Sequence, residues 1–175
     1  MKVPPSDRSL EELREELDRI RRPLRIAVVR PKNPFNVGAI IRVAHSFLVR
    51  EIILVGKAPY YERAAMGMAK FENIREVDDE SALIRWARDE KLPIVVLERD
   101  GARESLWTCP LPAACLMVFG AEDFGVGAEL IAAADQVVGI PMYGLNHSFP
   151  LSVAAGIAMA EWTRRHVEQP TRGGA

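Results

Sequence analysis

The chain alternates short apolar runs with longer segments that carry apolar residues at helical spacing. Runs of four to six residues bounded by glycine, proline or charged residues are typical of buried strands. Such runs lie at residues 25–30, 51–55, 74–77, 93–97, 116–119 and 137–140. Between or before them, helical spacing is found at residues 9–22, 37–48, 60–71, 80–90 and 127–134. Strands that alternate with helices predict an α/β fold, with a mainly parallel sheet flanked by helices.

A further helix is predicted after residue 148 and has an unusual composition. Ser148 can cap it and Pro150 stands just inside its start, which is a helix-entry signal. Small residues alternate with larger apolar ones along it. The small residues are Ala154, Ala155, Gly156, Ala158 and Ala160. Because small side chains let another backbone come close, we expect this helix to be packed tightly on more than one side.

The first predicted helix, residues 9–22, stands apart from the repeated pattern. Ser9 and Glu12 form a capping-box sequence, and one apolar stripe runs along the helix. It is predicted to be an appendage that packs on the domain or on a partner subunit. An alternative is that its basic end contacts RNA, through Arg19, Arg21, Arg22 and Arg25. The predicted divisions are an extension at 1–23, one domain at 24–167 and a loose tail at 168–175.

Composition narrows the class of protein. The 175 residues are 49% hydrophobic and 27% charged, which is ordinary for a soluble globular domain. We find no apolar run of membrane-spanning length and no charged-then-apolar leader, so a cytoplasmic protein is expected. Two cysteines and three histidines lack the spacing of metal ligands, and no metal is predicted. With a net charge of −1, any affinity for RNA must come from local patches.

Ligands of parallel sheets bind beyond the carboxyl ends of the strands, and three glycine- or proline-rich segments begin there. They follow Arg30, Phe119 and Ile140. Glycines 120, 125 and 127 come between a strand and a helix, but their spacing differs from G-x-G-x-x-G, and no acidic residue ends the next strand. A Rossmann dinucleotide site is therefore not favoured.

Three segments in the same order resemble a known family. They are NPFNVGAIIRVAHSF (33–47), LMVFGAEDFGVGAELI (116–131) and IPMYGLNHSFPLSVAAGIAMAEW (140–162). They are similar to the three motifs of the SpoU/TrmH class of RNA 2′-O-ribose methyltransferases, within the SPOUT or α/β-knot superfamily. The resemblance implies a C-terminal deep trefoil knot, S-adenosyl-L-methionine as cofactor, a homodimer and an RNA substrate. We expect tRNA, with ribosomal RNA as the alternative.

The same resemblance implies site residues. Those predicted to line the cofactor site are Leu97, Gly120, Ile140, Met142, Ser148 and Phe149. Those predicted to act in catalysis are Arg42, Asn36, Glu122 and Ser148, with the arginine reaching across the subunit interface. The side chain of Arg42 is expected to lie over Gly38, four residues before it. Since arginine stays protonated, we expect Arg42 to hold a substrate phosphate, and Glu122 and Asn36 to fix Arg42 or the ribose.

One position departs from the family pattern. Where the third motif commonly reads serine, leucine, asparagine, this chain has Ser148, Phe149 and Pro150. Proline removes a side-chain amide and a backbone donor, so the hydrogen bonds around Ser148 should differ. Two alternatives therefore stay open at this point: a catalytically inactive RNA-binding protein on the same fold, and a different α/β nucleotide-binding enzyme.

Overall fold

The computed structural model describes residues 8–56, 60–121, 123–145 and 147–168. Within these ranges seven strands form one sheet in the order β3-β2-β1-β6-β4-β7-β5, and all their pairings are parallel. The strands are β1 (Arg22–Val29), β2 (Val49–Val55), β3 (Ile74–Val77), β4 (Ile94–Leu97), β5 (Glu104–Ser105), β6 (Cys115–Phe119) and β7 (Gln136–Gly139). The predicted α/β class is confirmed, and the carboxyl ends of the strands meet at one edge.

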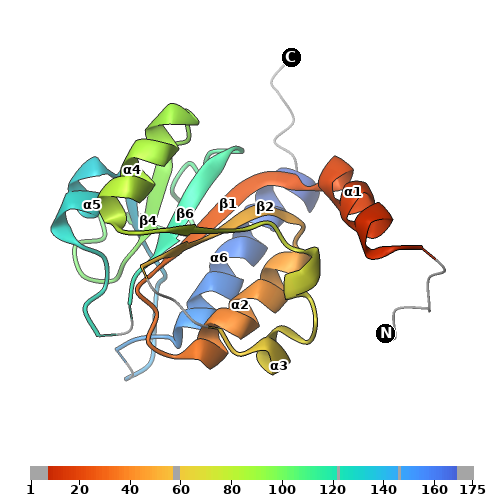
Figure 1. Cartoon of the computed structure of the whole chain (residues 1–175). Helices are drawn as coiled ribbons and strands as arrows, with labels where there is room; N and C mark the ends of the chain where they lie inside the picture. Colours follow the sequence, from red (N-terminus) through yellow and green to blue (C-terminus); the bar gives the residue numbers. More distant parts are fainter. Residues whose placement is uncertain (1–7, 57–59, 122, 146, 169–175) are drawn as a thin grey trace, which may run out of the picture.

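Helices cover both faces of the sheet (Figure 1). On one face α2 (Pro34–Ser46) lies beside α6 (Leu151–Thr163), and on the other α4 (Glu80–Asp89) lies beside α5 (Ala128–Ala133). The short turns α3 (Glu62–Ala65) and η1 (Ala69–Phe71) extend the first layer, and the π-helical turn η2 (Arg164–Glu168) continues α6. The helix α1 (Leu10–Ile20) lies to the side of the sheet.

The central strands contribute alternate residues to two hydrophobic cores. In β1, Ile26 and Val28 belong to the core under α2 and α6, whereas Ala27 and Val29 belong to the core under α4 and α5. The other central strands repeat this division. Because both faces are buried, the strands read as continuous apolar runs in the sequence, and this is why they could be located there.

The amino edge of the sheet is closed by a buried arginine. The side chain of Arg21 is 1% exposed, donates to Asp18 Oδ1 and to Glu72 Oε2, and also bonds the carbonyls of Val49 and Phe71. The predicted capping box of Ser9 and Glu12 is confirmed. Arg21 therefore anchors α1 to the domain and is not available to contact RNA, because its guanidinium is buried and engaged. Contact of RNA with the other basic residues of this end, such as the exposed Arg19 and Arg22, stays a prediction.

Several predicted boundaries are wrong for local reasons. The helix α2 begins at Pro34 because the side chain of Asn33 accepts a hydrogen bond from Phe35 N at 2.9 Å, so Asn36 lies in the first turn and not at the entrance. At the other motif, Pro150 is the N-cap of α6 and Ser148 lies two residues before it, so Ser148 does not cap this helix. The strand β5, only two residues long, was not predicted.

The predicted helix at residues 60–71 is broken into α3 and η1. The break is at Met66 and Gly67, which have φ values of 52° and 75°. The α3 turn packs on Gly38, where an added Cβ would lie 2.6 Å from Tyr61 O and 2.7 Å from Ala64 Cβ. The space over Gly38 is thus occupied by α3, and it does not receive the Arg42 guanidinium as predicted.

Candidate active site at the carboxyl edge of the sheet

A cleft of about 800 Å³ lies at the carboxyl edge of the sheet. It is enclosed by the loops that follow β4, β6 and β7 and by the first turn of α6. The structure brings all six predicted cofactor-site residues to its wall: Leu97, Gly120, Ile140, Met142, Ser148 and Phe149. These residues come from the segments after β4, β6 and β7. Of the three segments predicted to converge, those after Phe119 and Ile140 line the cleft, whereas no described residue of the segment after Arg30 lines it. Their contact with a cofactor remains a prediction.

The loop after β6 forms a tight hairpin. Ala121 N donates to Gly125 O at 3.1 Å, and Gly125 N donates to Ala121 O at 2.9 Å. Gly125 has a φ of 61°, which favours glycine. A Cβ added to Gly120 would lie 2.3 Å from the Gly125 carbonyl carbon. Gly120 is therefore required by a close approach of backbone to backbone, inside the wall of the cleft.

Glu98 supports this hairpin from the loop after β4. Its Oε2 accepts a hydrogen bond from Val126 N at 3.2 Å, and its Oε1 accepts one from Arg99 N at 2.9 Å. The carboxylate packs against Gly125, where an added Cβ would lie 2.4 Å from Oε2. The Glu98 side chain thus fixes the distance between two of the three loops.

The loops after β4 and β7 are joined by Arg99. Its guanidinium pairs with Asp100 at 2.6 Å and also donates to the His147 carbonyl. The hydrogen bond from Arg99 lowers the pKa of Asp100, and the same bond raises the pKa of Arg99. Since these groups face solvent, the pairing orders the rim of the cleft more than it stabilises the fold.

The predicted catalytic residues are divided by the structure. Ser148 lines the cleft, whereas Asn36 and Arg42, both on α2, do not. The Asn36 Oδ1 accepts a hydrogen bond from Ser152 Oγ at 3.0 Å, which links the first turns of α2 and α6. Arg42 is exposed and forms no ion pair with any residue in the described ranges. Glu122 lies outside the described residues.

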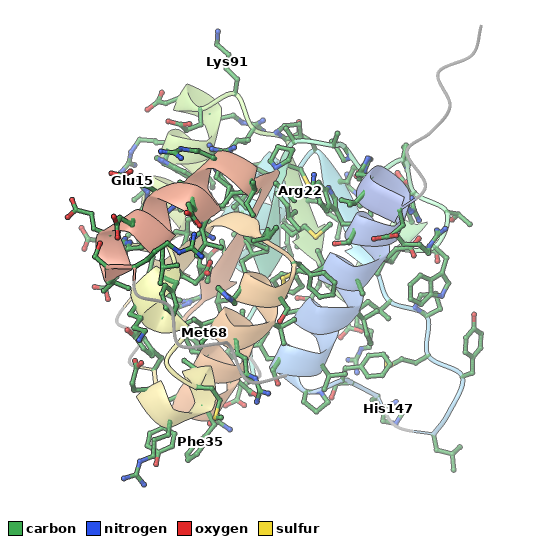
Figure 2. All side chains as sticks on the ribbon, turned by 90° about the vertical axis from the view of Figure 1, so that its right-hand side faces the viewer. Glu15, Arg22, Phe35, Met68, Lys91 and His147 are labelled. Atoms are coloured by element: carbon green, nitrogen blue, oxygen red, sulfur yellow. The ribbon has the colours of Figure 1, made fainter. Side chains whose placement is uncertain are left out.

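Two further residues of the cleft were not singled out from the sequence: Glu98 and Phe124. The only signal for Glu98 was its place directly after a buried strand. Phe124 had a clearer one, because a large aromatic residue between acidic residues and a glycine is unusual in a tight turn. His147 lines the cleft. Figure 2 shows His147 and Phe35 at the same end of the molecule, with Arg22 well away from both.

Two classes of feature are not found in the part of the chain that the structure describes. Its helices include none of the length and apolarity needed to cross a bilayer. Its histidine, cysteine and acidic side chains include no group of three placed to bind a metal ion.

Comparison with known proteins gives one consistent match. The family model described as "SpoU rRNA Methylase family" matches residues 23–160. A 23S rRNA (guanosine-2′-O-)-methyltransferase of Nitrosomonas europaea is 31% identical over 81% of this chain and 56% of its own length. A tRNA (guanosine(18)-2′-O)-methyltransferase of Thermus thermophilus is 30% identical over 88% of this chain and 81% of its own length. The chain thus spans little more than half of the first relative.

Solved structures agree with the sequence match. The TrmH/SpoU tRNA modifying enzyme of Aquifex aeolicus superposes with a TM-score of 0.81 and 27% identity, over 91% of this chain and 83% of that one. The AdoMet-bound rRNA methyltransferase of Sinorhizobium meliloti gives a TM-score of 0.75 and 29% identity, over 86% of this chain and 60% of that one. With the cleft, the three motifs and these matches together, the chain belongs to the SpoU rRNA methylase family.

Proposed function

We propose that this protein transfers a methyl group from S-adenosyl-L-methionine to a ribose 2′-hydroxyl of RNA. The observation that carries the proposal is the convergence of three family motifs on one end of the fold, two of them on a single cleft closed by the Gly120–Gly125 contact. Relatives named as 2′-O-methyltransferases of tRNA and of 23S rRNA support it.

The cleft suits a nucleoside-containing cofactor. Its deep wall is apolar, with Leu97, Phe119 and Val138, and its rim carries polar groups. The glycine pair brings main chain, and not side chain, to the wall, which is how a flat ring can be held closely. We expect Leu97, Gly120, Ile140, Met142, Ser148 and Phe149 to hold it. When bound, S-adenosyl-L-methionine supplies a methyl group made electrophilic by its sulfonium.

Arg42 is assigned to the placing of RNA. Arginine side chains carry no free base in proteins, so a guanidinium is not suited to remove the proton of the 2′-hydroxyl. It can form two parallel hydrogen bonds to a phosphate and so align the hydroxyl for attack, while the phosphate is placed to receive the proton. Asn36, held by Ser152, and Glu122 are proposed to fix this arrangement, with Ser148 at the cleft.

A homodimer completes the site in this proposal. Arg42 does not line the cleft of its own chain, so we assign it to the cleft of a second subunit. The helices α2 and α6 offer a suitable face beside it, where Val153 is 44% exposed, Gly156 and Ala160 are small, and an added Cβ on Gly156 would be 3.8 Å from Val43. We also propose the family's C-terminal knot, which is supported by the position of β4 between β6 and β7.

We propose tRNA as the substrate, in preference to ribosomal RNA. The match to the tRNA enzyme of Thermus thermophilus covers 88% of this chain, against 81% for the rRNA enzyme. The structural likeness is also greater to the tRNA modifying enzyme of Aquifex aeolicus. The division into residues 1–23, 24–167 and 168–175 and the cytoplasmic location stay predictions.

Two measurements test the proposal. Isothermal titration should show binding of S-adenosyl-L-methionine, and mass spectrometry of RNA from a strain lacking the gene should show one ribose methylation missing from tRNA. If the missing methyl group is in ribosomal RNA, ribosomal RNA is the substrate and the assignment of tRNA is wrong. If the protein neither binds the cofactor nor methylates RNA, the alternative of an inactive RNA-binding protein is favoured. Stabilisation by another nucleotide in a thermal-shift screen would instead favour a different α/β enzyme.

A further inference from the structure

Aromatic rings are exposed along a line that starts at the cleft. We define the aromatic strip as Phe124, Lys32, Phe35 and Tyr61. Phe124 lines the cleft and is 77% exposed, Phe35 is 57% exposed, and Tyr61 is 36% exposed. Such rings are normally buried in a folded domain, so a continuous run of them at the surface indicates a binding surface.

The strip consists of two contacting pairs, Phe124 with Lys32 and Phe35 with Tyr61, joined along the chain by the segment 32–35. The Lys32 Nζ lies 5.0 Å from the centre of the Phe124 ring and is also ion-paired with Asp123 of the same hairpin. Lys32 is joined to Phe35 through Asn33, whose side chain caps α2 by accepting from Phe35 N. The rings of Phe35 and Tyr61 are 4.5 Å apart. Figure 2 shows Phe35 at the foot of α2, at the end of the molecule where His147 lines the cleft.

The rings are held in place. Phe124 stands on the hairpin closed by the two hydrogen bonds between Ala121 and Gly125, and Tyr61 N donates to Pro34 O at 3.0 Å. Ordered aromatic faces lose little conformational freedom when another flat ring stacks on them. Nucleobases are such rings, and proteins that hold single-stranded RNA combine stacked aromatic side chains with nearby cations.

We propose that the aromatic strip holds the nucleotides next to the methylated one, by stacking their bases in single-stranded form. This inference rests on the proposed function, because it places the flanking RNA beside the cleft where the ribose would react. Phe124 lines the cleft in which the ribose would react, so the nucleotides next to that ribose lie beside the strip. Stacking also suits a chain whose net charge of −1 offers little general attraction for phosphate.

The test separates stacking from charge. Binding of a short oligoadenylate is compared with that of the matching abasic oligonucleotide, which has the same phosphates and no bases. The wild-type protein should bind the oligoadenylate more tightly. Each of Phe124→Ala and Phe35→Ala should weaken that binding by about fivefold or more and leave abasic binding unchanged. Trp107→Ala is the matched control, since Trp107 is 42% exposed and does not line the cleft; it should change neither.

Phe35→Leu distinguishes stacking from an apolar contact between two copies of the chain. Leucine keeps the apolar surface and lacks the aromatic face, so oligoadenylate binding should fall in Phe35→Leu while the oligomeric state, measured by light scattering, stays unchanged. The proposal is overturned if the Phe35 variants dissociate a dimer with RNA affinity intact, or if both oligonucleotides are affected equally. Cofactor titration of the wild-type protein keeps the two proposals apart. A protein that prefers oligoadenylate and binds no S-adenosyl-L-methionine would contradict the proposed function, whereas base stacking by the strip would still stand.

Discussion

The two edges of the sheet use the same kinds of residue in opposite ways. At the amino edge, charged groups are buried and joined to one another: Arg21 and Glu72 have side chains that are 1% and 0% exposed, and His45 Nδ1 lies 2.7 Å from Glu72 Oε1. At the carboxyl edge, Phe124 and Tyr143 are 77% and 90% exposed. Arg42, further along α2, also faces solvent. The charged groups of the amino edge are paired with one another inside the protein, while the side chains exposed at the carboxyl edge are available to contact a ligand.

The comparison indicates which side chains of this fold serve stability and which serve binding and catalysis. A buried charge is tolerated only when its partners are in place, so changes at the amino edge should act on stability. An exposed side chain contributes little to stability, so changes at the carboxyl edge should act on binding and catalysis. Four substitutions test this division.

Arg21→Ala should have the largest effect on folding. It removes one of the two partners of a fully buried Glu72 carboxylate, the other being His45, and leaves the Val49 carbonyl without this donor. The free energy of unfolding should therefore fall by about 3–5 kcal/mol. Urea denaturation measures this. Arg75→Ala is the control, because Arg75 pairs with Glu51 while 46% exposed, and its loss should cost less than about 1 kcal/mol. Equal costs for the two variants would show that the amino edge is not held by its buried charge.

Arg42→Ala should have the largest effect on activity. If the guanidinium orients RNA in the second subunit's cleft, kcat/KM for methyl transfer should fall by about 10²–10³-fold. The melting temperature and the affinity for S-adenosyl-L-methionine should hardly change, since Arg42 is exposed and lies outside its own cleft. Arg42→Lys keeps the charge without the two parallel donors and should recover only part of the activity. Full activity in Arg42→Ala would remove this residue from the mechanism.

Gly120→Ala should damage the carboxyl edge through its backbone. The added Cβ would meet the Gly125 carbonyl carbon at 2.3 Å, so the hairpin must move, at a cost of about 1–3 kcal/mol in stability. Affinity for the cofactor, measured by titration, should fall by more than the stability loss explains. Gly101→Ala is a useful comparison, because Gly101 has a φ of 85° but no atom within 4 Å of its added Cβ. It should lose stability from backbone strain and keep its cofactor affinity.

Glu161→Gln tests whether the ion pairs of Glu161 make the stability of the fold depend on pH. Hydrogen bonds from Arg164, and then from Arg165, lower the pKa of Glu161 from 4.5 to about 2, against the effect of its burial. A lowered pKa stabilises the fold above the unfolded value of 4.5, and this stability is lost as the pH falls toward 2. Because Arg164 is half exposed and solvent screens its charge, we expect the ion pairs of Glu161 to add only about 2 kcal/mol to the free energy of unfolding at pH 7.

The variant should therefore be less stable at neutral pH, and its stability should depend less on pH between 4.5 and 2. Urea denaturation of both proteins across this range gives the two curves. Parallel curves would show that the ion pairs of Glu161 add nothing to folding.

Part of the site could be read before the fold was known. The loops after Phe119 and Ile140 were identifiable because buried strands give continuous apolar runs, and the turns that follow them contain glycine and proline. The loop after Leu97 was expected at the cofactor site only through the resemblance to the SpoU/TrmH family. The close contact between the backbones of Gly120 and Gly125 could not be predicted, since both glycines would fit a turn whether or not they touch. The burial of Arg21 and the exposure of Arg42 could not be read either, because both are arginines on helices and local spacing does not show what packs against them.

The sequence by itself determined the α/β class and most strand positions, because these follow from local spacing, which depends on residues near one another in the chain. The residues expected at the cofactor site followed from the resemblance of three segments to the motifs of the SpoU/TrmH family. Only the tertiary structure decided that Arg21 is buried while Arg42 is exposed, that α3 covers Gly38, and that Phe124 and Phe35 belong to one strip. Burial and contact between distant segments are set by how the elements pack, and no local pattern records them.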